Sequence, residues 1–330
     1  MKAYIEKANA ESLAASSSKT MYMDCMRMLK KHCSIDLNFP KEDLKASSEL
    51  MKWFTTFFTD GVGQNSLHFD EPSILPRPLK SNMHKLINTN PKNLSSIYLL
   101  DGDDVQRIKD IGTLLIAPVG QEVETLSNLI FEDGQYNYPI DVTQFKSWNE
   151  ITTFISPLTD IILVDRFILS DSSLYEANLY TILKELCQYL KAKINIVIFT
   201  LPEYYDNNTK LTYKPSFDII RKNIKNKVEQ VTGYPPAVTI ILSRELEEHD
   251  RTLFTNYKTF VSGDSFNYLN SQGELITDGR YLYVSSHVYT NNDKIFEKFY
   301  TDMQQLVDKI KQKNNPDLIK GDKESNYLNF

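Results

Sequence analysis

The sequence predicts an α/β protein in which a mixed β-sheet is covered by helices, preceded by a helical N-terminal region and a small α+β module. Between residues 151 and 313, short apolar segments alternate with longer segments of helical periodicity, as expected for strands and helices that share one sheet. The first 80 residues show helical periodicity instead, and residues 81–150 mix the two patterns. With 330 residues, the chain is long enough for two domains.

Residues 1–80 are interpreted as a helical region followed by a linker. From Glu42 to Asp60 the apolar residues recur at helical spacing, and Gly61 supplies a C-cap. Residues 61–81 contain three prolines and have loop composition, which is typical of a linker. The aromatic residues of this helix are Trp53, Phe54, Phe57 and Phe58. A docking face for a protein partner is one interpretation of them, and burial against the chain's own second module is the favoured one.

Residues 81–150 are interpreted as a small α+β module. Ser96–Leu100 and Thr113–Ala117 are short apolar segments bounded by Asp and Gly residues, which indicates strands. The apolar spacing of residues 121–131 fits a helix or a strand, and both alternatives stay open.

Residues 151–313 form the main predicted domain. Its expected strands are Ile161–Val164, Ile194–Thr200, Ala237–Leu242, Leu253–Phe254, Thr259–Val261 and Tyr281–Val284. Its expected helices are Ser172–Leu190, Ser216–Val231 and Asp293–Ile310. The remaining residues, 314–330, are polar and are expected to be disordered.

Composition narrows the class of protein. The net charge of −6 argues against a protein that coats nucleic acid through its overall field, but it leaves room for a local basic surface. Cys25, Cys33 and Cys187 are sparse, and no second ligand pair follows at zinc spacing, so we expect reduced thiols and neither a metal nor a cofactor. No signal peptide and no apolar segment of ~18 residues is found, and a cytoplasmic location is expected.

One motif carries chemical groups at a fixed spacing. His249 and Arg251 are separated by one residue, four residues lead to Asn256, and six more lead to Gly263. This pattern resembles the His-x-Lys-x4-Asp-x6-Gly motif of the phospholipase D superfamily, with Arg in place of Lys and Asn in place of Asp. Asp165 and Arg166 follow a predicted buried strand.

With this earlier element, residues 151–310 are similar to the phospholipase D-like C-terminal domain that accompanies microtubule-interacting-and-trafficking helices, and to its bacterial relatives. Those relatives occur beside nucleic-acid and defence machinery, so the resemblance implies a subunit role in such a system.

The resemblance implies a site that handles phosphate. In that family one His is the nucleophile, a second His is the general acid, and the cation stabilises the phosphate oxygens. Here Arg251 can bind phosphate in a bidentate manner, whereas Asn256 cannot stabilise an imidazolium by charge. The predicted phosphate-binding residues are Asp165, Arg166, His249, Arg251 and Asn256.

Three functions remain open for this site. The first is a non-catalytic module that binds nucleic acid, anionic lipid or a partner protein. The second is a metal-independent phosphodiesterase that acts as a homodimer, because the chain has one His-x-Arg element and two His249 side chains would be needed. The third is a purely structural corner.

A second candidate is a basic segment with neighbouring tyrosines. Its cations are Lys210, Lys214, Arg221, Lys222, Lys225 and Lys227. A solvated helix face is the favoured interpretation, and contact with a nucleic acid backbone or phospholipid headgroups is the alternative. Tyr204, Tyr205 and Tyr213 are close enough in sequence to stack on bases.

Overall fold

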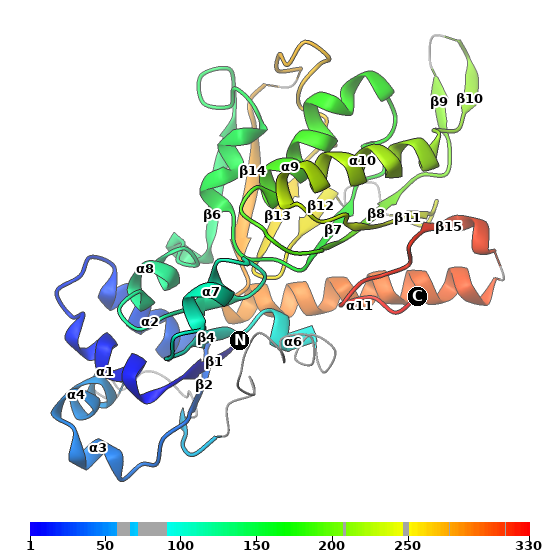
Figure 1. Ribbon diagram of the computed structural model, residues 1–330. Helices are drawn as coiled ribbons and strands as arrows, with labels where there is room; N and C mark the ends of the chain where they lie inside the picture. The colour runs from blue at the N-terminus through cyan, green and yellow to red at the C-terminus, as the bar shows by residue number, and fades with distance from the viewer. Residues whose placement is uncertain (58–66, 72–90, 207–208, 247–250, 277, 314) are drawn as a thin grey trace. The chain divides into compact units, whose positions relative to one another are not determined.

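A computed structural model of the chain describes residues 1–57, 67–71, 91–206, 209–246, 251–276, 278–313 and 315–330 (Figure 1). It divides into two compact units. Unit 1 comprises residues 1–134 and 286–295, and unit 2 comprises residues 135–285 and 296–330. In the described residues, no helix combines the length and the apolar character needed to cross a lipid bilayer.

Unit 1 is built on a parallel sheet of five strands in the order β3-β2-β1-β4-β5. The strands are β1 (Lys2–Ile5), β2 (Ser34–Leu37), β3 (Leu67–His68), β4 (Ile97–Leu99) and β5 (Leu115–Ala117). The helices are α1 (Lys7–Ala15), α2 (Tyr22–His32), α3 (Asp43–Ala46), α4 (Ser48–Thr56), α6 (Pro91–Leu94), α7 (Val105–Lys109) and α8 (Glu122–Ser127). Tyr4 and Tyr98 pair across β1 and β4, and their rings stack with centroids 5.3 Å apart.

The expectation of a helical region over residues 1–80 is only partly met. β1 and β2 lie within it, and they pair with β4 of the predicted α+β module, so the two segments form one unit. Four-residue strands carry too little periodicity to be recognised before their partners are known. Trp53 and Phe57 are buried within unit 1, with ring centroids 4.8 Å apart, which agrees with burial and not with an exposed docking face. Most of the predicted linker lies outside the described residues, and Phe58 does too.

Unit 2 is the predicted mixed sheet covered by helices. Its eight strands have the order β15-β11-β8-β7-β12-β13-β14-β6. They are β6 (Gln135–Ile140), β7 (Asp160–Val164), β8 (Asn195–Thr200), β11 (Ala237–Leu242), β12 (Arg251–Phe254), β13 (Lys258–Ser262), β14 (Arg280–Ser286) and β15 (Ile319–Gly321). β7, β8 and β11 are parallel to each other, and β12 runs antiparallel to β7.

Helices cover both faces of this sheet. Figure 1 shows α9 (Thr181–Cys187) and α10 (Phe217–Thr232) on one face and α11 (Thr290–Gln312) along the other. Side-chain alternation explains this arrangement, because neighbouring residues of β12 point to opposite faces. Leu253 packs in the layer that contains Ile182 and Leu186 of α9, whereas the Phe254 ring lies 4.0 Å from that of Phe299 on α11.

Residues 315–330 are ordered in the structure, contrary to the expectation of a disordered tail. β15 pairs antiparallel with β11, and the Asp322 carboxylate accepts a hydrogen bond from the Val238 backbone N–H at 2.7 Å. Asn326 binds the buried Asp160, and Tyr327 is buried against Phe296 of α11. The polar composition of the tail gave no sign of this order, because hydrogen bonds to partners far away in the chain hold the tail in place.

Candidate functional site

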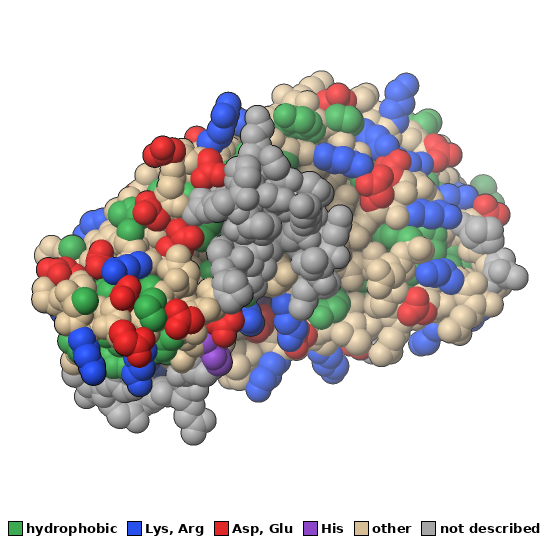
Figure 2. All heavy atoms as spheres, turned by 60° about the horizontal axis from the view of Figure 1, so that its bottom comes forward, with side chains coloured by type: hydrophobic (Ala, Val, Ile, Leu, Met, Phe, Trp, Pro, Cys, Tyr) green, Lys and Arg blue, Asp and Glu red, His purple; other side chains and the backbone are tan. Residues whose placement is uncertain are grey.

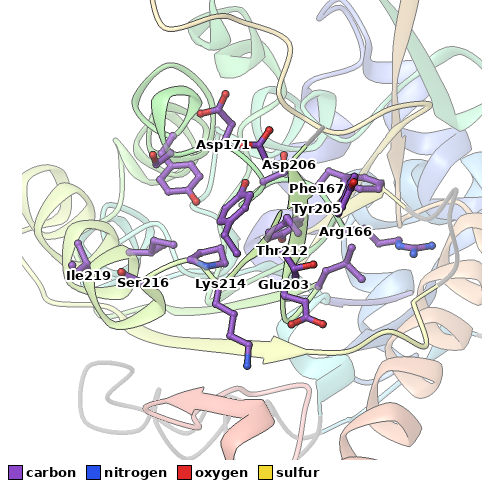
Figure 3. Close-up of a pocket in the computed structure, with 18 of the residues that line it drawn as sticks. Arg166, Phe167, Asp171, Glu203, Tyr205, Asp206, Thr212, Lys214, Ser216 and Ile219 are labelled. Carbon is purple, nitrogen blue, oxygen red and sulfur yellow. The ribbon is translucent and has the colours of Figure 1, made fainter. Parts of the chain in front are cut away.

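The candidate site is a pocket at the carboxyl ends of β7, β8 and β11. Because these strands are parallel, Arg166 after β7, Leu201 after β8 and Arg244 after β11 arrive at the same edge of the sheet. The pocket has a volume of about 1510 Å³, and all its lining residues belong to unit 2. Figure 3 shows Arg166 and Phe167 at this edge, together with Tyr205 and Thr212 from a neighbouring hairpin.

That hairpin supplies an aromatic wall. It is a two-stranded ribbon of β9 (Tyr204–Asp206) and β10 (Leu211–Tyr213), in which Tyr204 lies directly opposite Tyr213 with ring centroids 5.9 Å apart. The Tyr204 hydroxyl is fixed by a 2.6 Å hydrogen bond to Thr200, whereas more than half of the Tyr205 side chain is exposed. Tyr204 is therefore a fixed, buried part of the hairpin, whereas Tyr205 presents its ring to solvent.

A second pair of tyrosines comes from the turn that leads into α9. Residues Glu176–Tyr180 form a single turn of π-helix, a geometry that is often found at functional sites. The Tyr175 and Tyr180 rings lie 6.0 Å apart, and the Tyr175 hydroxyl donates to the Leu169 carbonyl at 2.8 Å. Burial raises the pKa of Tyr175 well above its usual value, so this ring is neutral at physiological pH.

Charges in the pocket are distributed unevenly. Asp171 and Asp206 lie close to Tyr213, where their negative charges add to the effect of burial and raise the pKa of that tyrosine. The cations that line the pocket are Arg166, Lys214 and Arg244. Arg244 forms an ion pair with Glu203, and Glu176 forms one with Lys227 at 2.5 Å. Two of the acidic side chains are thus neutralised by neighbours.

Two arginines converge on the Phe167 ring. The guanidinium carbons of Arg166 and Arg251 each lie 5.8 Å from its centroid, a distance typical of cation–π contact. Arg166 lines the pocket, but Arg251 does not. The Arg251 side chain is 12% exposed and donates to the Gly263 carbonyl at 2.8 Å, while its Nε is buried without a hydrogen-bond partner among the described residues.

Asp165 holds this edge of the sheet together. Its carboxylate is fully buried and accepts hydrogen bonds from the Phe167 N–H at 2.8 Å, the Ser265 hydroxyl at 2.7 Å and the Phe266 N–H at 2.8 Å. Burial raises the pKa of Asp165, and these hydrogen bonds oppose that rise. The residue therefore fixes the turn that carries Arg166 and Phe167 instead of facing the pocket.

Asn256 lies at the opposite end of the strand pair, so the structure does not bring the predicted set together. Because β12 is antiparallel to β7, Arg251 meets the carboxyl end of β7 while Asn256 meets its amino end. The Asn256 side chain is fully buried, and its Oδ1 accepts from the Thr159 and Asp160 N–H groups at 2.8 and 3.3 Å. In this structure it holds backbone and cannot reach a ligand of Arg251. His249 lies outside the described residues.

The predicted basic patch is divided in the same way. Arg221 and Lys225 form ion pairs with Asp322 at 3.5 and 2.8 Å, and Lys227 pairs with Glu176. Lys210, Lys214 and Lys222 are exposed. Three of the six cations therefore hold the C-terminal tail and a pocket turn in place, which agrees with a structural role for them. Figure 2 shows acidic and basic side chains intermingled over one face of the molecule.

The structure adds three residues to those predicted: Asp171, Tyr175 and Arg244. Arg244 lies two residues after a predicted strand end, which was a usable signal, but the positions of Asp171 and Tyr175 depend on a turn whose course only the fold reveals. Within the described residues, no group of three or more His, Cys, Asp and Glu side chains could hold a metal ion.

No protein-family model and no curated protein sequence matches the chain.

Proposed function

We propose that this chain is a non-catalytic binding module that holds a phosphate-bearing ligand in the pocket at the carboxyl ends of β7, β8 and β11. The observation that carries the proposal is that Arg166 shares this pocket with the tyrosines of the β9–β10 hairpin. The carboxyl edge of parallel strands is where α/β sheets place their ligands. A guanidinium group matches the geometry of phosphate oxygens, and its position over Phe167 orients it.

The proposal covers binding without hydrolysis. Phosphoryl transfer through His249 would need a partner that orients the imidazole, and the residue at the motif's third position, Asn256, is engaged at the far end of β12. This supports the binding interpretation over a homodimeric phosphodiesterase. A cytoplasmic location is part of the proposal and fits the free thiols of the three cysteines.

Binding of three probes tests the proposal: inorganic phosphate, a 12-nucleotide single-stranded DNA, and vesicles with and without phosphatidylserine. We expect at least one of these phosphate sources to bind, because they share the group that Arg166 recognises. The Arg166→Ala variant should bind that probe about tenfold more weakly, the effect of losing one charge-assisted hydrogen bond. The measurement is fluorescence anisotropy for DNA, calorimetry for phosphate and co-sedimentation for vesicles.

Arg107→Ala is the matched control, because Arg107 is an exposed arginine of α7 in unit 1. Its affinity should equal that of the native chain. Equal affinities of the Arg166→Ala variant and the native chain would overturn the proposed site. Hydrolysis of bis(4-nitrophenyl) phosphate in excess chelator, lost in His249→Ala, would overturn the non-catalytic part and restore the phosphodiesterase interpretation.

A further inference from the structure

The pocket has two chemically different sides. Figure 3 shows Asp171 and Asp206 together on one side and Arg166 on another. Tyr213 belongs to the acidic side, because both carboxylates act on it. A ligand that fills the pocket therefore meets the Arg166 guanidinium on one side and hydrogen-bond acceptors beside the Tyr213 ring on another.

We propose that the pocket binds single-stranded nucleic acid and selects bases that carry an exocyclic amino group. A backbone phosphate binds Arg166, a base stacks on the partly exposed ring of Tyr213, and the amino group of that base donates to Asp171 or Asp206. This inference rests on the proposed function, since it assigns the phosphate-bearing ligand to a chemical class. It also accounts for the acidic side of the pocket, which phosphate binding alone does not.

The Asp171 carboxylate has capacity for a further donor. Asp171 Oδ1 accepts from the Ser173 N–H at 2.8 Å and from its hydroxyl at 2.7 Å, and Asp206 Oδ2 accepts from the Thr209 hydroxyl at 2.9 Å. An ionised carboxylate offers about four lone-pair sites, so Asp171 can also accept from an amino group of cytosine, adenine or guanine. Thymine and uracil present a carbonyl oxygen at the equivalent position, which a carboxylate repels.

Size and polarity favour a strand over the other phosphate sources. The pocket exceeds the range of about 300–1,000 Å³ that encloses a drug-sized ligand, so a single phosphate or mononucleotide would leave it largely empty. An anionic lipid headgroup offers a phosphate to Arg166 but no aromatic face to the tyrosine rings of the pocket. In a duplex, each base is stacked and paired, so its faces cannot reach a tyrosine ring. An unpaired strand offers phosphate, aromatic face and amino group in succession.

The test compares three DNA probes of 12 units under one salt concentration: oligodeoxycytidine, oligothymidine and an abasic strand. Cytosine and thymine are both pyrimidines, so they stack similarly and differ mainly in the amino group that the pocket is proposed to read. We expect oligodeoxycytidine to bind at least tenfold more tightly than oligothymidine, and the abasic strand to bind most weakly. Fluorescence anisotropy titrations measure all three affinities.

Variants separate the contributions of the two sides. Replacement of both carboxylates, Asp171→Asn and Asp206→Asn, should reduce the preference for cytosine to less than about twofold, because an amide both donates and accepts and therefore suits either base. Tyr213→Leu should weaken oligodeoxycytidine about fivefold or more and leave the abasic strand unchanged. Asp171 is exposed, so Asp171→Asn alone provides a folded variant in which the preference should also fall if the double variant does not fold.

Each result has a distinct meaning. Equal affinity for all three probes, weakened by Arg166→Ala, would overturn base recognition and leave the proposed phosphate site standing. Tighter binding of both base-bearing strands than the abasic strand, without preference between them, would overturn amino-group selection. Absence of binding to every probe, together with failure of the phosphate and vesicle arms, would overturn the proposed function itself.

Discussion

Both ends of β7 carry a buried aspartate beside a polar side chain, but only the carboxyl end opens into a pocket. Each end has a fully buried aspartate, Asp160 at the amino end and Asp165 at the carboxyl end, and each aspartate binds backbone N–H groups of a distant segment. At the amino end the neighbouring polar side chain, Asn256, is also consumed by internal hydrogen bonds. At the carboxyl end the neighbouring side chain, Arg166, lines a large pocket. A polar motif residue therefore indicates function only when the strand end that carries it faces a pocket.

The largest effect expected at the amino end concerns pH and Lys258. This lysine is buried, its ammonium donates to the Phe154 carbonyl at 2.8 Å, and burial lowers its pKa to about 7. Because the folded pKa lies below the unfolded value, the unfolded chain binds the proton first, so the stability that Lys258 contributes is present at high pH and lost as pH falls towards 7.

Lys258→Met should remove this dependence. Between pH 10 and pH 7 the native chain should lose up to about 4 kcal/mol of unfolding free energy relative to the variant, at roughly 1.4 kcal/mol per pH unit. Urea denaturation at several pH values measures the difference. Lys298→Met, at an exposed lysine of α11, is the control and should track the native chain. Parallel pH profiles for the native chain and Lys258→Met would disprove the assignment.

Asn256→Ala tests the amino end directly. The substitution leaves the Thr159 and Asp160 N–H groups buried without their acceptor, and we expect a loss of about 3 kcal/mol of unfolding free energy. Ligand affinity of the folded protein should stay unchanged. Chemical denaturation and binding titrations give both quantities, with Asn137→Ala on the exposed part of β6 as the control. If the Asn256→Ala variant were fully stable but bound the ligand more weakly, Asn256 would have to be part of the ligand site.

The third prediction concerns the tail that reaches the amino end. Gly321 has φ +115°, and a Cβ there would overlap the Val238 carbonyl and lie 2.6 Å from the Arg221 Nε. Gly321→Ala should therefore destabilise β15 by about 2 kcal/mol and speed hydrogen exchange over residues 319–328. Gly273→Ala is a matched control, because its φ is +80° but no atom lies within 4 Å of the added carbon. Equal effects of the two substitutions would show that backbone strain alone, and not tail packing, is responsible.

The smallest effect is expected for Arg251→Ala at the carboxyl end. Loss of the hydrogen bond to the Gly263 carbonyl should cost about 1 kcal/mol of stability. Because Arg251 does not line the pocket, this variant should bind phosphate-bearing probes within about threefold of the native chain, whereas Arg166→Ala should be about tenfold weaker. A reversed order of the two variants would show that the motif arginine, rather than the pocket arginine, carries binding.

Sequence patterns located the central strands and the main helices of unit 2, because buried strands such as Ile161–Val164 and stripes such as that of α10 leave a strong local signal. They also identified Arg166, Lys214 and the hairpin tyrosines as ligand candidates, which the structure brings into one pocket. Short strands such as β1 and β15 were not predicted, since their residues become strands only through pairing with distant partners.

By itself, the sequence determined that an α/β sheet would form and that a basic residue would follow a buried strand, because both depend on local order of residue types. Only the tertiary structure decided which motif residues share a site. The extended strand β12 holds Arg251 and Asn256 apart, and its antiparallel pairing with β7 places Arg251 at the carboxyl end of β7 and Asn256 at its amino end. No spacing in the chain records the direction of that partner strand. The turn after β7 and the β9–β10 hairpin line one pocket although they are far apart in sequence. Only the fold determines that they meet, because separation in sequence does not fix separation in space.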